Sequence, residues 1–116
     1  MAYVEHFEIP ADDIDRAQKF YQNVLEFSYE PWGDDMGMLN PPGEEGISGD
    51  LHQREVLTHP TVVFTVENIE QTVALAIAHG GEQLGEIQPL GEQDRWVYIR
   101  DSEGNLIGLY DDTAVA

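Results

Sequence analysis

The sequence contains no cysteine, few basic residues and no long apolar run. Without cysteine the chain cannot form disulfides, thiolate nucleophiles or cysteine-based zinc sites. No segment is long and apolar enough to span a bilayer. The first ten residues, MAYVEHFEIP, lack the apolar core of a signal peptide, so we expect a cytoplasmic protein.

The chain has 5 Lys and Arg against 23 Asp and Glu, for a formal net charge of -18. Binding to nucleic acids and to anionic membranes depends on basic side chains that displace counterions. We therefore expect neither as a partner. The charge is compatible with a preference for a cationic partner, but net charge bears more directly on solubility than on function.

The first half of the chain predicts one strand, one helix and then three short strands. Residues 3–9 alternate apolar and polar side chains, as a half-exposed strand does, and Pro10 is expected to end the strand. Asp12 or Asp13 then caps a helix that ends at about Leu25, with apolar residues at helical spacing. The three strands that follow are expected at residues 27–32, 36–39 and 47–53.

The second half repeats this order of elements. Residues 61–66 form a β-branched and aromatic run, which is typical of a strand. Asn68 begins a helix that runs to residue 79, with Gln71 three residues later as in a capping box. Three further strands are expected at residues 82–87, 95–100 and 105–110.

The two halves therefore form an architectural repeat of strand, helix and three strands. The helix starts Ile14 and Ile69 define an offset of 55 residues, and the same offset aligns His6 with Thr61. One such βαβββ module cannot bury its sheet alone, whereas two can share a curved mixed sheet around a cleft, with the helices on the outer face. We expect an α+β fold in a single domain, residues 1–116, with modules at about 3–54 and 59–112.

Three segments resemble the vicinal oxygen chelate superfamily, which contains glyoxalases, bleomycin- and fosfomycin-resistance proteins and extradiol dioxygenases. The segment VEHFEIPADDIDRAQKFYQNVLEF is similar to the first module of that superfamily. The segments TVVFTVENIEQTVALAIAHGGE and YIRDSEGNLIGLYD are similar to the second module. The resemblance covers about residues 3–112 and is strongest to small glyoxalase-like members. It implies a homodimer, because relatives commonly pair.

The resemblance also implies where a metal would lie. Metal-dependent members take two ligands from each module, typically His and Glu, in its first and last strands. His6 matches the first of these positions, Thr61 the equivalent one in the second module, and Gly108 the last strand of that module. By internal symmetry Gly49 falls near the remaining position. Only His6 is a metal ligand by type, so the resemblance implies an incomplete site and no firm cofactor.

A second set of ligands would support a divalent metal ion. Asp50 and His52 share a face if residues 47–53 are extended, and His59 lies two residues before Thr61. Together with His6, these side chains could bring two or three nitrogen and oxygen donors to one ion.

The alternation of side chains also predicts a ligand-binding face. If Gly108 faces the cleft, alternation places aromatic and polar residues of the last two strands on the same side. Such a mixture suits a small organic molecule, although a dimer contact or a second core layer would use the same residue types. The predicted substrate-binding residues are Trp96, Tyr98, Arg100, Tyr110, Thr61 and Gly108. His6 and Glu8, two residues apart on one face, are the candidate catalytic residues, as a general acid–base pair.

Three functions follow from this pattern. The first is a glyoxalase/bleomycin-resistance-like protein that binds a small organic molecule in an aromatic-lined cleft without a complete metal site. The second is a divalent-metal-dependent lyase or isomerase of the glyoxalase type. The third is a non-catalytic interaction subunit. The sequence favours the first and leaves enzymatic activity open.

Overall fold

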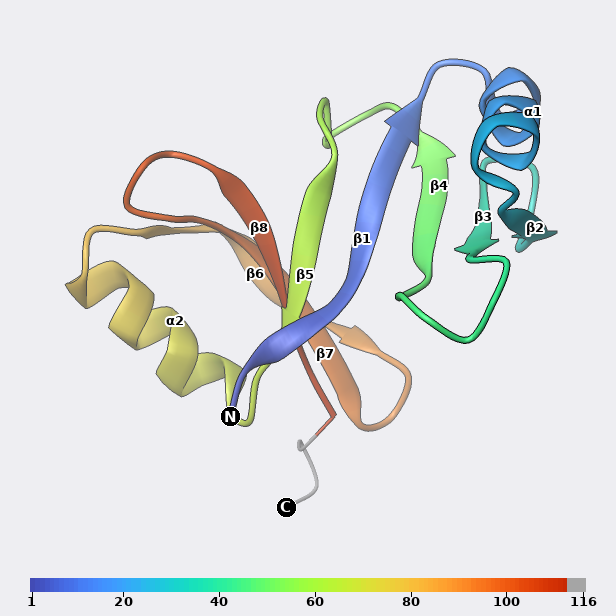
Figure 1. Cartoon of the computed structure of the whole chain (residues 1–116). Helices are drawn as coiled ribbons and strands as arrows, with labels where there is room; N and C mark the ends of the chain where they lie inside the picture. Colours follow the sequence, from blue (N-terminus) through green and yellow to red (C-terminus); the bar gives the residue numbers. More distant parts are fainter. Residues whose placement is uncertain (113–116) are drawn as a thin grey trace. The chain divides into compact units, whose positions relative to one another are not determined.

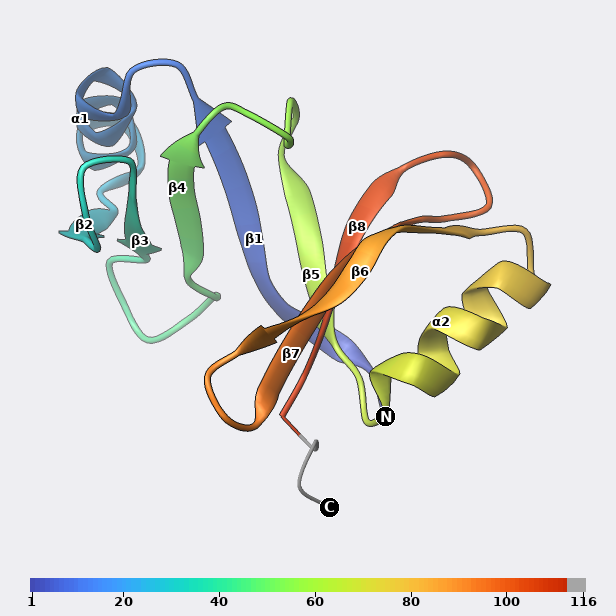
Figure 2. The same cartoon turned by 180° about the vertical axis from the view of Figure 1, so that it is seen from behind.

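The computed structural model describes residues 1–112, and these form two compact units (Figures 1 and 2). The first unit comprises residues 6–61, and the second comprises residues 1–5 together with the chain from residue 62. Each unit contains one helix and four main strands, which gives the α+β fold class that the sequence predicts. No helix in the described part of the chain is long and apolar enough to cross a membrane.

In the first unit, the strand order is β2-β3-β4-β1. β1 and β4 run parallel, and the other neighbouring strands run antiparallel. Helix α1 contacts β2 and β4. The elements are β1 (Tyr3–Ala11, which begins in the second unit), α1 (Ile14–Leu25), β2 (Ser28–Pro31), β3 (Met36–Asn40) and β4 (Gly49–Gln53).

In the second unit, the strand order is β5-β8-β7-β6. Again the first and last strands, β5 and β8, run parallel, and the other pairs are antiparallel. Helix α2 contacts β6, β7 and β8. The elements are β5 (Thr61–Thr65), α2 (Ile69–Ala78), β6 (Glu82–Leu90), β7 (Asp94–Arg100) and β8 (Leu106–Asp111).

The shared pairing pattern confirms the internal repeat. In both units the strand before the helix pairs parallel with the last strand, and the helices begin at Ile14 and Ile69 as predicted. Two tandem βαβββ modules are therefore present. The cleft that such modules can enclose stays a prediction.

Side-chain caps begin both helices. The Asp13 carboxylate accepts a hydrogen bond from the Arg16 amide at 3.0 Å, and the Asn68 side chain accepts one from the Gln71 amide at 2.9 Å. Each cap satisfies a backbone amide that has no partner inside the helix. Asp13, the second of the two candidates, is thus the cap of α1.

Each unit has its own apolar core on the side of its helix. In the first unit the strand residues Phe7 and Ile9 pack with buried Leu39 and Leu51. In the second unit, the buried core residues are Val66, Ile69, Val73, Val97, Ile99 and Leu109. The side-chain alternation predicted for β1, β7 and β8 is therefore present, with the apolar sides facing the helices.

The prediction that Pro10 ends the first strand is wrong, because β1 continues to Ala11. The Arg54 amide donates to the Ala11 carbonyl at 2.8 Å, so Ala11 directs its backbone groups toward the neighbouring strand. Along a strand, the backbone N–H and C=O groups of alternate residues point to the same neighbouring strand. Because Ala11 points to β4, Pro10 does not, and the pairing with β4 needs no N–H group from it.

Strand β6 also runs further than predicted, to Leu90 instead of residue 87. Its pairing with β7 changes register between Leu84 and Gln88. Gly85, with φ of +79°, lies within this irregular segment. A bulge with a left-handed glycine lets the strand continue after the shift.

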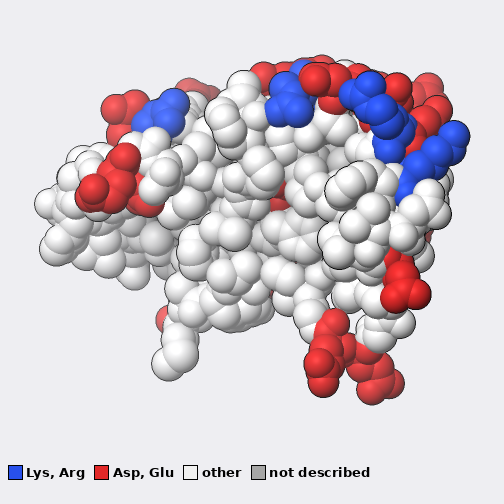
Figure 3. All heavy atoms as spheres, turned by 45° about the horizontal axis from the view of Figure 1, so that its top comes forward, with Lys and Arg blue, Asp and Glu red and all other residues white. Residues whose placement is uncertain are grey.

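The few basic side chains lie among acidic ones. On the face drawn in Figure 3, the blue atoms of Lys and Arg lie beside red atoms of Asp and Glu and form no separate basic patch. One such pair joins Arg54 Nε to Asp12 Oδ1 at 2.9 Å. Another joins Arg95 Nη2 to Asp111 Oδ2 at 2.7 Å.

Candidate functional site

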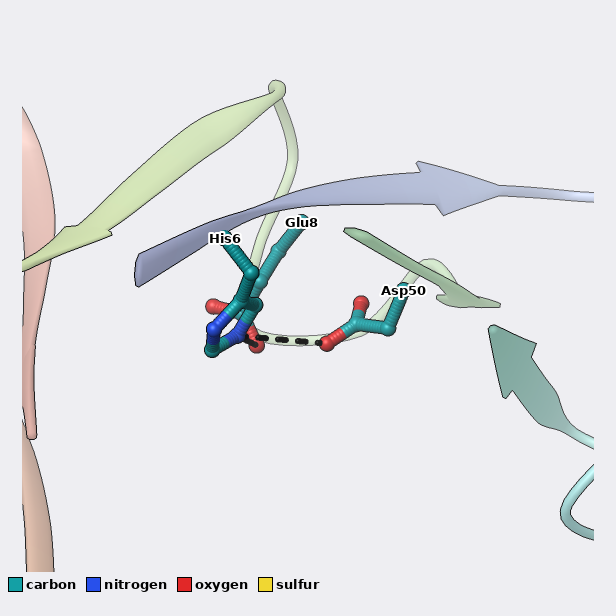
Figure 4. Close-up of side chains that lie close together, drawn as sticks. All are labelled: His6, Glu8 and Asp50. Carbon is teal, nitrogen blue, oxygen red and sulfur yellow. Dashed lines mark ion pairs between the residues drawn. The ribbon is translucent and has the colours of Figure 1, made fainter. Parts of the chain in front are cut away.

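Three potential metal ligands converge on one face of β1 and β4. Glu8 is the direct partner of Asp50 in the parallel pairing, and His6 precedes Glu8 by two residues on the same face. His6 Nε2 lies 4.0 Å from Glu8 Oε2 and 3.9 Å from Asp50 Oδ2. One donor atom from each residue lies within 4.8 Å of the other two (Figure 4).

We call the three potential metal ligands His6, Glu8 and Asp50 the metal cluster. These side chains are largely shielded from solvent. The side chains are 26%, 14% and 8% exposed, respectively. Two carboxylates held this close in a partly dehydrated place repel each other unless positive charge lies near them. One imidazole and two carboxylates are also a donor set that suits first-row divalent ions. The residues therefore fit a divalent cation.

His52 extends the metal cluster along β4. Its Nδ1 atom lies 2.7 Å from Asp50 Oδ1, and the His52 side chain is 19% exposed. The hydrogen bond to Asp50 raises the pKa of His52 above its usual 6.5, while burial acts in the opposite direction. Asp50 is thus held at one oxygen by His52, and its other oxygen is the one near His6.

The structure corrects the position predicted for Gly49. Gly49 pairs with Phe7, whose side chain lies on the helix side, so the residue on the cluster side is Asp50. A Cβ atom at Gly49 would lie 2.2 Å from the Phe7 ring. Gly49 therefore makes room for a core ring and is not the counterpart of a metal ligand.

The strand registers identify the true counterpart of Gly108. Glu8 pairs with Asp50 in the first unit, and Val63, which is 55 residues after Glu8, pairs with Gly108 in the second. Asp50 and Gly108 are thus equivalent positions of the repeat. The first unit has a carboxylate there, and the second has no side chain.

At Gly108 close packing accounts for the glycine. A Cβ atom there would lie 2.8 Å from Val63 Cγ2. Val63 is itself 5% exposed. A glycine in the strand thus allows a buried valine to pack against the backbone of its neighbour.

The remaining two candidate positions are Thr61 and His59, which lie at and just before the start of β5. Thr61 is buried at the start of β5. His59 is exposed in the loop before β5, with Nδ1 3.0 Å from Thr58 Oγ1, and is not a member of the metal cluster. The alternative ligand set is thus brought together in part, with Asp50 and His52 near His6.

In the second unit the predicted binding residues share one strand face. The antiparallel pairing of β7 with β8 sets Trp96 opposite Tyr110 and Tyr98 opposite Gly108. Arg100 lies at the end of the same face, opposite Leu106. The residues between them, such as Val97 and Leu109, belong to the core beside α2. Whether this face binds a substrate stays a prediction.

The aromatic side chains of this face contact one another and an acidic residue. The Trp96 and Tyr98 rings have centroids 5.3 Å apart and planes at 66°. The Tyr110 hydroxyl donates a hydrogen bond to Asp94 Oδ2 at 2.8 Å. Burial, and then the bond to Asp94, raise the pKa of Tyr110 to about 12. We call Trp96, Tyr98 and Tyr110 the aromatic face.

Two acidic residues near the aromatic face were missed by the sequence analysis. Asp94 lies just before the predicted strand 95–100, and only the pairing of β7 with β8 brings it to Tyr110, sixteen residues away. Glu5 accepts a hydrogen bond from Thr65 Oγ1 at 2.9 Å, and its charge also raises the pKa of Tyr110. Neither residue has a local sequence pattern that would reveal these contacts.

Comparison with known proteins identifies the family. The model of the Glyoxalase/Bleomycin resistance protein/Dioxygenase superfamily matches residues 3–109. The chain belongs to this superfamily. The resemblance inferred from the three sequence segments is thereby confirmed.

Individual relatives are distant but cover nearly the whole chain. A glyoxylase-like domain-containing protein of Didymella fabae is 24% identical over 113 residues, 88% of each chain. A superfamily member from Vibrio splendidus 12B01 superposes with a TM-score of 0.70 at 20% identity, covering 97% of this chain and 99% of its own. The Mn(II)-bound glyoxalase of Novosphingobium aromaticivorans gives a TM-score of 0.66 at 12% identity, covering 96% of this chain and 39% of its own. At such identities the two structures show a shared fold.

Proposed function

We propose that this glyoxalase-superfamily protein binds a divalent cation at its metal cluster and, through it, a small organic molecule with oxygen donors. The observation that carries the proposal is the convergence of His6, Glu8 and Asp50, with donor atoms within 4.8 Å of one another. A similar fold holds Mn(II) in the Novosphingobium glyoxalase.

Each cluster residue has a definable part in this function. His6 would offer its Nε2 atom, and Glu8 and Asp50 one carboxylate oxygen each. A bound divalent cation supplies Lewis acidity, which polarises an oxygen of the bound molecule and suits lyase or isomerase chemistry. The shielding of the two carboxylates keeps water from screening their charge.

The three potential metal ligands all come from the first unit of the chain. Gly108, the equivalent of Asp50 in the second unit, offers no ligand, and Val63 packs beside it. Three protein donors leave the remaining coordination positions of an ion to water or to the organic molecule. An ion held by so few donors binds more weakly than one in a fully protein-ligated site, so we expect exchangeable metal.

The test is a titration of the purified protein with Mn²⁺, in which isothermal calorimetry measures the binding. We expect one ion per chain, with binding weakened at least about tenfold in Glu8→Gln and in Asp50→Asn. His6→Ala should behave in the same way. His59→Ala, a histidine outside the cluster, is the matched control and should bind as the unaltered protein does. Absence of binding at millimolar Mn²⁺ contradicts the proposal.

A second candidate function is favoured by the aromatic face. The half-buried rings of Trp96, Tyr98 and Tyr110 on β7 and β8 suit metal-free binding of a small, partly apolar molecule. In this function His6 and Glu8 would act as a general acid–base pair. Thermal unfolding in the presence of small metabolites tests it, because a ligand of the folded state raises the melting temperature. No shift with any compound, with and without Mn²⁺, counts against small-molecule binding.

A further inference from the structure

The aromatic face contains an angled pair of rings. Trp96 and Tyr98 point to the same side of β7, and their ring planes meet at 66° with centroids 5.3 Å apart. Both side chains are half-buried. A positively charged group in the corner between two such rings lies within reach of both π systems, which attract cations electrostatically.

Carboxylates lie at the Tyr110 end of this face. Tyr110 is directly opposite Trp96, and its hydroxyl donates to Asp94 at 2.8 Å. Asp112 and Glu5 also act on Tyr110 through their negative charge. An organic ligand seated against these rings therefore meets a negative potential, which a cationic group would compensate.

The basic residue of this face lies at its other end. Arg100 is two residues beyond Tyr98 and four beyond Trp96, which is about 13 Å from Trp96 along an extended strand. Its Nη1 atom donates to the Gly104 carbonyl at 3.0 Å, within the loop between β7 and β8. Its charge is therefore directed to the loop and away from the carboxylates near Tyr110.

We propose that the aromatic face binds an organic cation of the quaternary or alkylated ammonium class, seated in the corner between Trp96 and Tyr98 beside Asp94. The net charge of -18 would also draw such a ligand to the protein at low salt. The inference rests on the second candidate function, small-molecule binding at this face, and does not depend on a cation at the metal cluster.

The test compares two probes of nearly the same shape, choline and its uncharged analogue 3,3-dimethyl-1-butanol. Trp32 is 53% exposed and would mask the response, so the experiment uses Trp32→Phe, in which Trp96 is the remaining tryptophan. We expect choline to change the Trp96 fluorescence saturably and to bind about tenfold more tightly than the alcohol. Sodium chloride at equal ionic strength is the blank.

Variants separate the corner from the general negative charge of the chain. Trp96→Leu keeps an apolar side chain but removes the π face, and we expect choline binding measured by calorimetry to be lost. Asp94→Asn should weaken choline binding several-fold and leave binding of the alcohol unchanged. Asp34→Asn, in the loop before β3 in the first unit, removes the same charge elsewhere and should have no effect.

The outcomes distinguish the inference from the function on which it rests. Equal binding of choline and the alcohol overturns the cationic specificity, while small-molecule binding at the aromatic face stands. Binding of choline that persists in Trp96→Leu assigns it to diffuse charge and also overturns the inference. Binding of neither probe, with no thermal shift from any other organic compound, contradicts both.

Discussion

Asp50 and His52 are joined by a hydrogen bond of 2.7 Å between Oδ1 and Nδ1, two residues apart on β4. The other carboxylate oxygen, Oδ2, is the one that lies 3.9 Å from His6 Nε2. A carboxylate held at one oxygen presents the second in a defined direction, which lowers the cost of ordering it around an ion. We therefore expect His52 to act as a positioning residue for the metal cluster.

Replacing His52 tests this role. His52→Phe keeps a ring of similar size but cannot donate to Asp50, and we expect Mn²⁺ affinity to fall about tenfold. His52→Gln retains a donor group and should restore part of the affinity. Calorimetric titration of both variants measures the effect, with His59→Gln as the control outside the cluster. Unchanged affinity in His52→Phe, together with unchanged thermal stability, would show that the hydrogen bond has no role.

Asp111 allows a prediction about the stability of the second unit. Its carboxylate is fully buried, accepts the Ile69 amide of the α2 N-terminus at 2.7 Å, and pairs with Arg95 at 2.7 Å. Arg95→Ala leaves this buried charge without its cation, and we expect a loss of about 3 kcal/mol in the free energy of unfolding. Urea denaturation measures it.

Two further variants show whether that loss comes from the buried charge. Glu70 also pairs with Arg95, but Glu70 is exposed, so Glu70→Gln should cost much less than Arg95→Ala. Adding Asp111→Asn to Arg95→Ala removes the unpaired charge and should recover part of the lost stability. A double variant less stable than Arg95→Ala alone would argue against this explanation.

The order of elements was predictable because its determinants are local. Asp13 and Asn68 cap their helices through amide groups only three residues away. In β7 and β8, alternate residues face the core and the opposite side of the sheet, which the sequence pattern shows directly. The repeat of 55 residues followed from the helix starts alone. The end of the first strand was less predictable, because a strand accepts Pro10 only if its pairing does not need the missing N–H group. That depends on the pairing of β1 with β4, about forty residues away in the sequence.

The candidate site was less predictable because it depends on strand register. A one-residue change in register exchanges the two faces of a strand, and this separates Asp50 from Gly49. The preceding segment NPPGEEG has no periodicity from which the register could be derived. The contact of Asp94 with Tyr110 likewise depends on pairing across a hairpin.

Gly108 should tolerate a methyl group only if Val63 becomes smaller. The Cβ atom of Gly108→Ala would lie 2.8 Å from Val63 Cγ2, and we expect a loss of about 1–3 kcal/mol in the free energy of unfolding. Combined with Val63→Ala, the loss should be smaller than the sum of the two single changes. Chemical denaturation of the three variants gives the coupling energy. Gly43→Ala, where nothing lies within 4 Å of the added carbon, is the control, and simple additivity at Gly108 and Val63 would contradict direct packing.

Tyr110 predicts how stability changes in alkaline solution. Burial and the hydrogen bond to Asp94 raise the pKa of Tyr110 to about 12 in the folded chain, from an ordinary value of 10.0. The protonated phenol is thus favoured by folding, so its contribution is fully present below pH 10 and is lost as the pH rises from about 10 to 12. Tyr110→Phe has no ionisable group and should lose less stability over that interval than the unaltered chain. Denaturation at pH 9 and pH 11 measures the difference in stability. The ultraviolet absorbance of tyrosinate follows the ionisation directly. Identical pH dependence of the two proteins would show that Tyr110 ionises as freely as a solvent-exposed tyrosine.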